Sequence, residues 1–386
     1  MKKFILGFVF VVGISITVLI FLNATQSPQI SAAIVGLQAN QSIAGYARAD
    51  RIRTFTFPDD HGAHPEFQTE WWYYTGNLES TDGRRFGYQL TFFRRAITPT
   101  ETARQSDWAT NQIYFAHFAL TDAQHNSHQA SERFSRGAAG LAGATGKPFR
   151  VWIENWDATA LDALGNRIQL RADDTTHALN LTLTAVKPIV LHGERGLSQK
   201  STEAGNASYY LSFTRMATQG TIIVNGESFQ VRGESWMDHE WSTAVLGENA
   251  IGWDWFSIQL SDQRELMLFQ IRQKDGSIEP MSSGTLIESD GTTQHLTRDQ
   301  FDIKVLSTWT SNQTRATYPA RWKISVPSAG IELELIPIVA DQEMKVSIVY
   351  WEGAVDVSGQ SNKQAVTGRG FVEMTGYAVQ SAVSSK

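Results

Sequence analysis

Residues 70–95, EWWYYTGNLESTDGRRFGYQLTFFRR, decide the fold class. Two runs of alternating apolar and polar side chains flank Asp82 and Gly83, a residue pair that favours the tight turn between antiparallel strands. The same signal recurs at three later positions: Asn225-Gly226, Asp275-Gly276 and Asp290-Gly291. Short alternating runs of this kind, on the order of sixteen to twenty, continue along the chain. The sequence therefore predicts an all-β protein built from antiparallel strands.

The chain of 386 residues is longer than one hydrophobic core usually serves, because most domains have roughly 50 to 250 residues. Two closed or nearly closed β-barrels in tandem account for both the length and the number of strands. We expect one barrel over residues 46–245 and a second over residues 246–382. The boundary is placed where STAVLGENA interrupts the strand pattern before GWDWFSIQL resumes it.

Residues 1–45 are predicted to be an export segment followed by a tether. Lys2 and Lys3 precede an uncharged apolar run over residues 4–22, which is the pattern of a secretory signal. As a helix this run would be roughly 28 Å long, so an uncleaved inner-membrane anchor is the alternative. Both interpretations predict a periplasmic or secreted protein, with membrane contact through residues 4–22 if the segment is not cleaved.

Composition excludes several classes of function. A net charge of -6 without a Lys/Arg cluster argues against a nucleic-acid partner. The absence of cysteine excludes disulfides, thiolate nucleophiles and Cys-ligated zinc. The 12 Trp, 10 Tyr and 20 Phe form a large stock of flat apolar surface, and much of it lies in three motifs that also carry Asp, His or Glu.

The first motif is FPDDHGAHPEFQTEWWYYTGNL, residues 57–78. If its end is a strand, Glu70 and Trp72 share one face, while Trp71 and Tyr73 share the other. A carboxylate would then lie close to aromatic rings whichever face points inward. These four residues are therefore candidates for binding a substrate.

The loop before this strand is a candidate structural or metal-binding loop. Its ligand-type residues are Asp59, Asp60, His61, His64 and Glu66. The two histidines could converge in a turn and be joined by His239. The spacing matches no established metal motif, however, so we expect no resident metal.

The second motif, GESWMDHEWS, covers residues 233–242. Strand alternation places Trp236, Asp238 and Glu240 on one face and His239 and Trp241 on the other, unless a bulge re-aims them. Again acids and indole rings share a face.

The third motif is GWDWFSIQL, residues 252–260, in which Trp253 and Trp255 flank Asp254. Asp254 is in phase with the apolar residues Phe256 and Ile258, and an acid on the apolar side of a strand has a raised pKa. A raised pKa keeps a carboxylic acid protonated and able to donate a proton.

Each acid also has a structural interpretation. Asp238, Glu240 or Asp254 could accept from an indole or backbone N–H, or could pair with Arg94 or Arg95 of a neighbouring strand. For any single acid this is the favoured interpretation. The occurrence of three clusters of acids and aromatic rings favours a functional site, because a core that needed only packing would not collect ionisable groups repeatedly.

Five segments resemble the AttH/CrtC-like family, which includes hydroxyneurosporene synthase, also called carotenoid 1,2-hydratase. They are PDDHGAHPEFQTEWWYYTGNL, GESWMDHEWS, GWDWFSIQL, YWEGAVDVSG and GRGFVEMTGY, in this order along the chain. The resemblance implies a tandem pair of lipocalin-like β-barrels. Relatives include hydratases that add water to an alkene of a carotenoid or isoflavonoid, pericyclic cyclases of fungal polyketide pathways, and exported proteins of unknown role.

Our leading hypothesis is therefore a cofactor-free, hydratase-like protein that binds a hydrophobic isoprenoid or lipid-like molecule. Alkene hydration needs a general acid, stabilisation of a carbocation, and a group that guides water. The catalytic candidates are Asp238 or Asp254 as proton donor and His239 or Glu240 to orient water. The substrate-binding candidates are Glu70, Trp71, Trp72, Tyr73, Trp236, Trp241, Trp253 and Trp255. The alternatives are a non-catalytic periplasmic lipid carrier and a metal-dependent secreted hydrolase.

Overall fold

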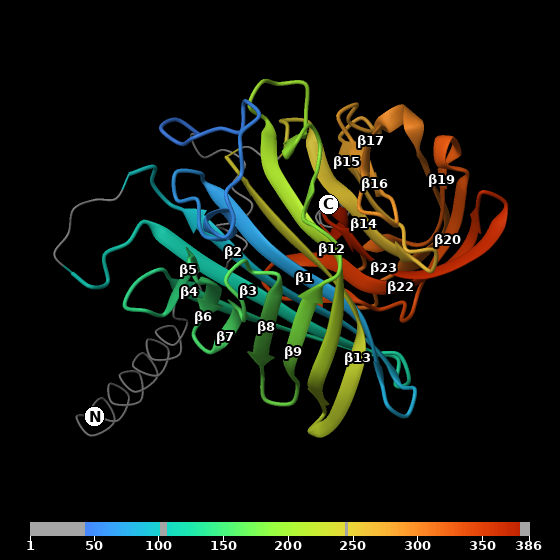
Figure 1. Ribbon diagram of the computed structural model, residues 1–386, viewed down its shortest axis with the longest axis horizontal. Helices are drawn as coiled ribbons and strands as arrows, with labels where there is room; N and C mark the ends of the chain where they lie inside the picture. The colour runs from blue at the N-terminus through green and yellow to red at the C-terminus, as the bar shows by residue number, and fades with distance from the viewer. Residues whose placement is uncertain (1–42, 101–105, 244–245, 379–386) are drawn as a thin grey trace, which may run out of the picture. The chain divides into compact units, whose positions relative to one another are not determined.

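The computed structural model describes residues 43–100, 106–243 and 246–378 (Figure 1). The predicted export or anchor segment, residues 4–22, lies outside these ranges. Three short 3-10 helices occur in the described residues: η1 (Asp59–His61), η2 (Arg298–Gln300) and η3 (Pro327–Ala329). Among these described residues, no helix is both long and apolar enough to cross a membrane.

The described residues between Thr69 and Ser242 form a 13-stranded antiparallel sheet, which we call the first sheet. Its strands are β1 (Thr69–Ser80), β2 (Arg85–Ala96), β3 (Gln112–Asp122), β4 (Ser127–Arg136), β5 (Ala142–Gly146), β6 (Phe149–Ile153), β7 (Trp156–Ala160), β8 (Arg167–Asp173), β9 (Ala178–Ala185), β10 (Val190–Leu191), β11 (Leu197–Gln199), β12 (Ala207–Val224) and β13 (Glu227–Ser242). The spatial order is β4-β3-β2-β1-β13-β12-β9-β8-β7-β6-β5, and β10 and β11 pair with β12. The turn between β1 and β2 contains Gly83 with φ +86°, as the Asp82-Gly83 pair predicts.

The remaining strands form a 10-stranded antiparallel sheet, the second sheet. Its strands are β14 (Ala250–Leu260), β15 (Glu265–Gln273), β16 (Ser283–Ile287), β17 (Thr293–Thr297), β18 (Asp302–Thr310), β19 (Thr317–Val326), β20 (Ile331–Pro337), β21 (Glu343–Lys345), β22 (Val349–Ser361) and β23 (Gln364–Met374). The spatial order is β17-β16-β15-β14-β23-β22-β20-β19-β18, with β21 on β22. The strands outnumber the predicted runs because β10, β11 and β21 have only two or three residues, too few to show alternation.

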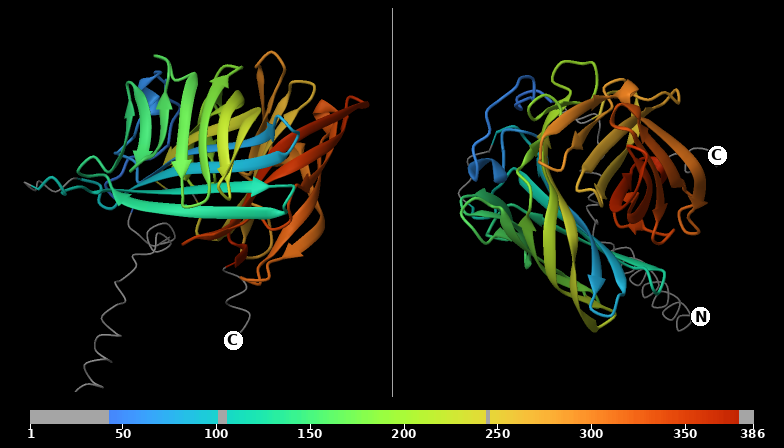
Figure 2. Two further views of the ribbon diagram at one scale, coloured as in Figure 1. Left: turned by 90° about the horizontal axis from the view of Figure 1, so that it is seen from below. Right: turned by 45° about the vertical axis from the view of Figure 1, so that its right-hand side comes forward.

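Each sheet curls around its own apolar core (Figure 2). The first forms a barrel and the second a half-barrel, which confirms the predicted all-β, tandem lipocalin-like fold class. The change of sheet falls in the connection between β13 and β14, which also contains the predicted boundary between residues 245 and 246. Both sheets nevertheless belong to one compact unit, so the division into two domains stays a prediction.

A third apolar cluster is shared by the two sheets. Tyr73, Tyr210 and Trp236 come from β1, β12 and β13, whereas Trp255 and Phe371 come from β14 and β23. Aromatic side chains of this size contribute strongly to apolar burial, so the shared cluster holds the two sheets together.

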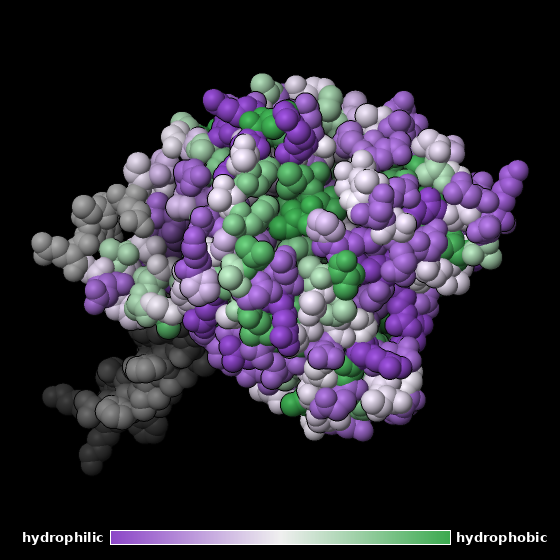
Figure 3. All heavy atoms as spheres, in the orientation of Figure 1, coloured by the Kyte–Doolittle hydropathy of each residue, from purple (hydrophilic) through white to green (hydrophobic). Residues whose placement is uncertain are grey.

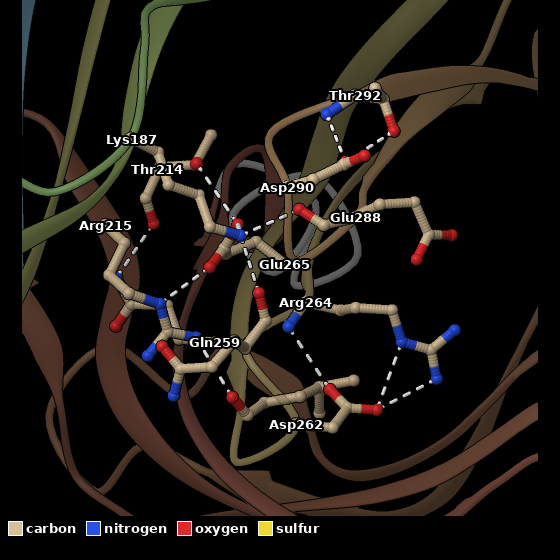
Figure 4. A network of polar contacts seen from close by, with 12 residues as sticks. Lys187, Thr214, Arg215, Gln259, Asp262, Arg264, Glu265, Glu288, Asp290 and Thr292 are labelled. Carbon is tan, nitrogen blue, oxygen red and sulfur yellow. Dashed lines mark hydrogen bonds and ion pairs between the residues drawn. The ribbon is translucent and has the colours of Figure 1, made fainter.

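Buried charges also join the sheets (Figure 4). Glu265 of β15 is 0% exposed and pairs with two cations from the part of the chain that forms the first sheet. Its carboxylate lies 2.8 Å from Lys187 Nζ and 2.6 Å from Arg215 Nε. Arg215 extends the network to Glu234 of β13 at 2.6 Å. Each buried charge therefore has a partner of opposite sign, as burial requires.

Candidate active site

Strands β1 and β13 distribute the predicted residues over two faces. Their register pairs Tyr73 with Asp238 and Trp72 with His239. The first pair lies on the face toward the second sheet, because Tyr73 belongs to the shared cluster. Trp72 belongs to the core of the first sheet. Asp238 and His239 are therefore adjacent in sequence but on opposite sides of the sheet, and they cannot act on the same substrate atom.

Asp238 is the centre of a hydrogen-bonded group between the sheets. Trp236 Nε1 donates to its Oδ1 at 2.6 Å, and the Ser212 hydroxyl donates to the same oxygen. The Tyr210 hydroxyl donates to Oδ2 at 2.9 Å and itself accepts from Trp255 Nε1 at 3.0 Å. Burial outweighs these donors and raises the pKa of Asp238 to about 7. Near neutral pH this acid is thus poised to gain or lose a proton.

Two further acids lie between the sheets, and neither is among the residues predicted from the sequence. Glu352 of β22 and Glu373 of β23 are directly opposed in the strand register. Glu352 is 1% exposed, whereas Glu373 is partly exposed and accepts from Trp253 Nε1 at 3.2 Å. Burial raises the pKa of both carboxyl groups, and the charge of Glu373 raises that of Glu352 further. This pair resists double ionisation.

Two tyrosines flank Glu352. The hydroxyls of Tyr73 and Tyr350 lie close enough to affect its pKa. Burial, followed by the nearby Glu352 charge, raises the pKa of both tyrosines well above 10. Tyr73 Oη and Glu352 Oε1 are buried without a hydrogen-bond partner among the described residues. Buried polar atoms normally have partners, so this point suits a water molecule or a polar group of a ligand.

Aromatic rings surround these acids. Trp255 packs edge-on against Tyr73, with ring centroids 5.2 Å apart. Phe93 and Phe115, on the neighbouring strands β2 and β3, stack at 4.4 Å. Trp71, Phe93 and Trp253 are partly exposed, so the aromatic wall reaches the surface. Figure 3 shows apolar residues gathered on the face where β12 and β14 appear in Figure 1.

Glu70 organises a separate cluster inside the first sheet. Its Oε1 lies 2.8 Å from both His64 Nδ1 and His239 Nε2, and its Oε2 lies 2.7 Å from Arg94 Nε. Burial alone would raise the pKa of Glu70, but these partners hold it well below its usual range. Burial likewise opposes protonation of His64, yet hydrogen bonds to Asp60 and Glu70 raise its pKa to about 8.

His64, Glu70 and His239 could also hold a metal ion, because their ligand atoms all lie within 4.8 Å of one another. Two histidines and one glutamate form a known zinc set. Here, however, the Arg94 guanidinium already neutralises Glu70, and both imidazoles donate to its carboxylate or share a proton with it. The geometry is therefore accounted for by a network of ion pairs and hydrogen bonds.

The predicted metal loop does not form one site. His61 Nε2 meets the carbonyl of Leu164 at 3.1 Å, while Asp60 pairs with Arg53 at 2.6 Å. The two remaining members are exposed: Asp59 and Glu66. Of this loop, His64 contacts Glu70 directly, and Asp60 is linked to the cluster through His64 Nε2 at 3.1 Å.

Asp254 is also separated from Asp238. It faces the core side of the second sheet, where its carboxylate pairs with Arg272 Nε at 3.1 Å and accepts from Gln270 at 2.9 Å and Tyr377 at 3.0 Å. Burial raises its pKa despite the Arg272 charge. The structural interpretation thus fits Asp254, with Arg272 in the place considered for Arg94 or Arg95.

The other predicted residues are divided between the Glu70 cluster and the space between the two sheets. Glu240 pairs with Lys200 Nζ at 2.8 Å, so it is not a free base. Trp241 stacks on His64 with ring centroids 3.8 Å apart, and Trp72 stacks on His239 at 4.9 Å. These two indoles line the Glu70 cluster. The inter-sheet site, defined as Asp238, Glu352, Glu373 and the surrounding rings, contains Trp71, Tyr73, Trp236, Trp253 and Trp255.

The family profile described as AttH-like matches residues 48–377. The chain belongs to the AttH-like family. A solved AttH structure from Nitrosomonas europaea is 35% identical to this AttH-like protein, covers 86% of this chain and 99% of its own, and has a TM-score of 0.76. No curated protein matches the chain.

Two more distant structures share the fold of this AttH-like protein. Kievitone hydratase from Nectria haematococca is 15% identical over 86% of this chain and 95% of its own, with a TM-score of 0.65. CghA is 12% identical over 87% of this chain and 97% of its own, with a TM-score of 0.50. At these identities the likeness concerns the fold alone.

Proposed function

We propose that this AttH-like protein adds water to a carbon–carbon double bond of an apolar, isoprenoid or lipid-like molecule bound at the inter-sheet site. The observation that carries the proposal is a group of three carboxyls with raised pKa values, the buried Asp238 and Glu352 and the partly exposed Glu373, beside a wall of aromatic rings. The name of its structural neighbour, kievitone hydratase, is consistent with this chemistry.

Glu352 is the proposed proton donor. Its buried carboxyl is held protonated, and its Oε1 has no hydrogen-bond partner among the described residues. Proton transfer to one alkene carbon uses the π electrons to form the new C–H bond and leaves a carbocation on the other carbon. The faces of nearby Tyr and Trp rings stabilise such a cation.

Glu373 is the proposed base. Burial raises the pKa of Glu373 to about 8, so its ionised form, which can accept a proton, is present in part of the molecules near neutral pH and predominates above about pH 8. It draws a proton from the water that attacks the carbocation. The C–O bond forms, the proton goes to Glu373, and alkene plus water is converted into an alcohol without a cofactor.

The test starts from the apolar molecules that co-purify with the protein, identified by mass spectrometry. Ligand-free protein is then incubated with each of them, and a gain in mass of one water is followed. We expect Glu352→Gln to lower turnover by roughly 100-fold or more while ligand binding is retained, because the variant loses only the transferable proton.

The matched control is Glu343→Gln. Glu343 is equally buried, but it accepts hydrogen bonds from Ser311 and Tyr318 of the second sheet. This variant should turn over ligand at the wild-type rate. Binding of the co-purified molecule by wild-type protein without any turnover would contradict the hydratase and support the lipid carrier.

A metal-dependent hydrolase is the third candidate function. It requires metal at a cluster such as His64, Glu70 and His239. Elemental analysis of the purified protein tests it, and the absence of stoichiometric metal would remove this candidate.

We further propose that the protein is exported to the periplasm or secreted. The support is the apolar run over residues 4–22 behind Lys2 and Lys3. Cell fractionation combined with N-terminal mass analysis distinguishes the forms. Cleaved protein will be soluble and shortened, anchored protein will keep residues 4–22 and sediment with membranes, and full-length protein in the cytosol would contradict export.

A further inference from the structure

A line of polar side chains leads from Glu352 toward the surface. Tyr350 lies two residues before Glu352 on β22, so the two side chains project from the same face of the strand, and the Tyr350 hydroxyl lowers the pKa of the Glu352 carboxyl. On its other side, the Tyr350 hydroxyl lies 2.8 Å from Nδ1 of His117 on β3. Both Tyr350 and His117 are buried. The line thus crosses from the second sheet to the first.

The outer end of this line is Glu132 on β4. The strand register places Glu132 directly opposite His117, and its carboxylate lies 3.8 Å from His117 Nε2. The Glu132 side chain is 36% exposed, and the Ser347 hydroxyl donates to it at 2.6 Å. His117 Nε2 has no hydrogen-bond partner among the described residues. A modest movement of Glu132 or one solvent molecule would complete the contact.

We propose that Glu132, His117 and Tyr350 form a proton relay that connects solvent with the buried carboxyl of Glu352. The relay rests on the proposed function, in which Glu352 is the acid. In each transfer, Tyr350 gives its hydroxyl proton to the Glu352 carboxylate and receives a proton from His117 Nδ1. His117 Nε2 then takes a proton from Glu132 or from a solvent molecule between the two side chains. One proton enters at the surface and one arrives at Glu352.

The proposed reaction creates the need for such a relay. Glu352 loses a proton and Glu373 gains one, so the pair must be reset before the next turnover. Glu373 is partly exposed and can release its proton, but Glu352 is 1% exposed. Burial lowers the pKa of His117 to about 3, which keeps the ring neutral, with one nitrogen protonated and the other free to accept. A neutral imidazole can therefore pass a proton by exchanging tautomers.

The experiment follows the carboxyl proton itself and needs no substrate. Protein in ordinary water is mixed rapidly into heavy water, and the infrared carbonyl band of protonated Glu352, assigned by its loss in Glu352→Gln, shifts as deuterium arrives. The measurements are made in a Glu373→Gln background, because Glu373 offers a second path to solvent. We expect His117→Phe and Tyr350→Phe each to slow this exchange at least roughly ten-fold.

The matched control is His128→Gln. His128, on β4, also has a pKa lowered by burial, to about 4, but its Nδ1 contacts Thr121 and not Tyr350. Its substitution should leave the exchange rate unchanged. Equal exchange rates in the Glu373→Gln parent and in its His117→Phe and Tyr350→Phe derivatives would overturn the relay and leave the proposed function standing. Absence of a protonated Glu352 band near neutral pH in protein that retains Glu373 would instead contradict the proposed function.

Discussion

At the level of single residues, Asp238 shows how burial can dominate hydrogen bonding. Three donors surround its carboxylate, and each of them lowers its pKa, yet the pKa rises from 3.8 to about 7. Between these two values the folded protein holds a proton that the unfolded chain has released. Folding therefore takes up a proton in this range, and the contribution of Asp238 to stability falls as pH rises from about 4 to 7.

This pH dependence of stability gives a prediction for Asp238→Asn, whose side chain cannot ionise. The free energy of unfolding of the variant should fall less than that of wild type between pH 4 and 7, by up to about 4 kcal/mol. Urea unfolding at several pH values measures both slopes. Parallel curves for the two proteins would show that Asp238 titrates normally in the folded state.

At the level of elements, alternation along one strand could be predicted from the sequence. The faces of β1 and β13 are as expected, because a period of two needs no knowledge of the partner strand. The pairing of Glu352 with Glu373 is not among these expectations, although both acids lie in segments that resemble the family. The hairpin between β22 and β23 pairs Ser361 with Gln364, and counting back from it places the two acids opposite each other. That register signal could have found them.

The separation of Asp254 from Asp238 could not be predicted in this way. It depends on which face of β14 packs against the first sheet, and both faces carry apolar or aromatic residues: Trp253 and Trp255 on one, Phe256 on the other. Only the packing of the sheets decides between them. Alternation likewise places His239 and Trp241 on one face of β13, but only tertiary packing determines which face of that strand lies toward the second sheet.

The ion-pair network of β15 gives a second prediction. Glu265→Ala removes the carboxylate between Lys187 and Arg215 and leaves two buried cations less well paired. We expect a loss of about 3–5 kcal/mol in the free energy of unfolding, measured with urea. The exposed pair of Lys345 and Asp341 is the comparison, and Asp341→Ala should cost less than about 1 kcal/mol. Similar losses in both variants would argue against a structural role for the network.

At the level of the whole molecule, the shared cluster makes the two sheets mutually dependent. Tyr73 and Trp236 lose their apolar surroundings if the second sheet unfolds, and Trp255 loses its own if the first does. The ion pairs of Glu265 with Lys187 and Arg215 also hold the two sheets together. Neither sheet therefore has a complete set of buried contacts by itself.

Calorimetry should accordingly show a single cooperative unfolding transition for the described part of the chain. Trp255→Ala leaves a cavity in the shared cluster. It should lower the midpoint temperature of this transition, corresponding to a loss of about 3–5 kcal/mol in the free energy of unfolding. Val305→Ala on β18 should leave it unchanged, since Val305 is exposed. Two well-separated transitions in the wild-type protein would mean that the sheets fold independently.

The direct opposition of Glu352 and Glu373 has a stereochemical consequence. Both side chains project from the same face of the second sheet, so an alkene lying over them meets its proton and its water from one side. Hydrogen and hydroxyl would then be delivered to the same face of the double bond. In heavy water such a syn addition would give a single diastereomer. Its configuration would show that both carboxyls act from the same side of the double bond.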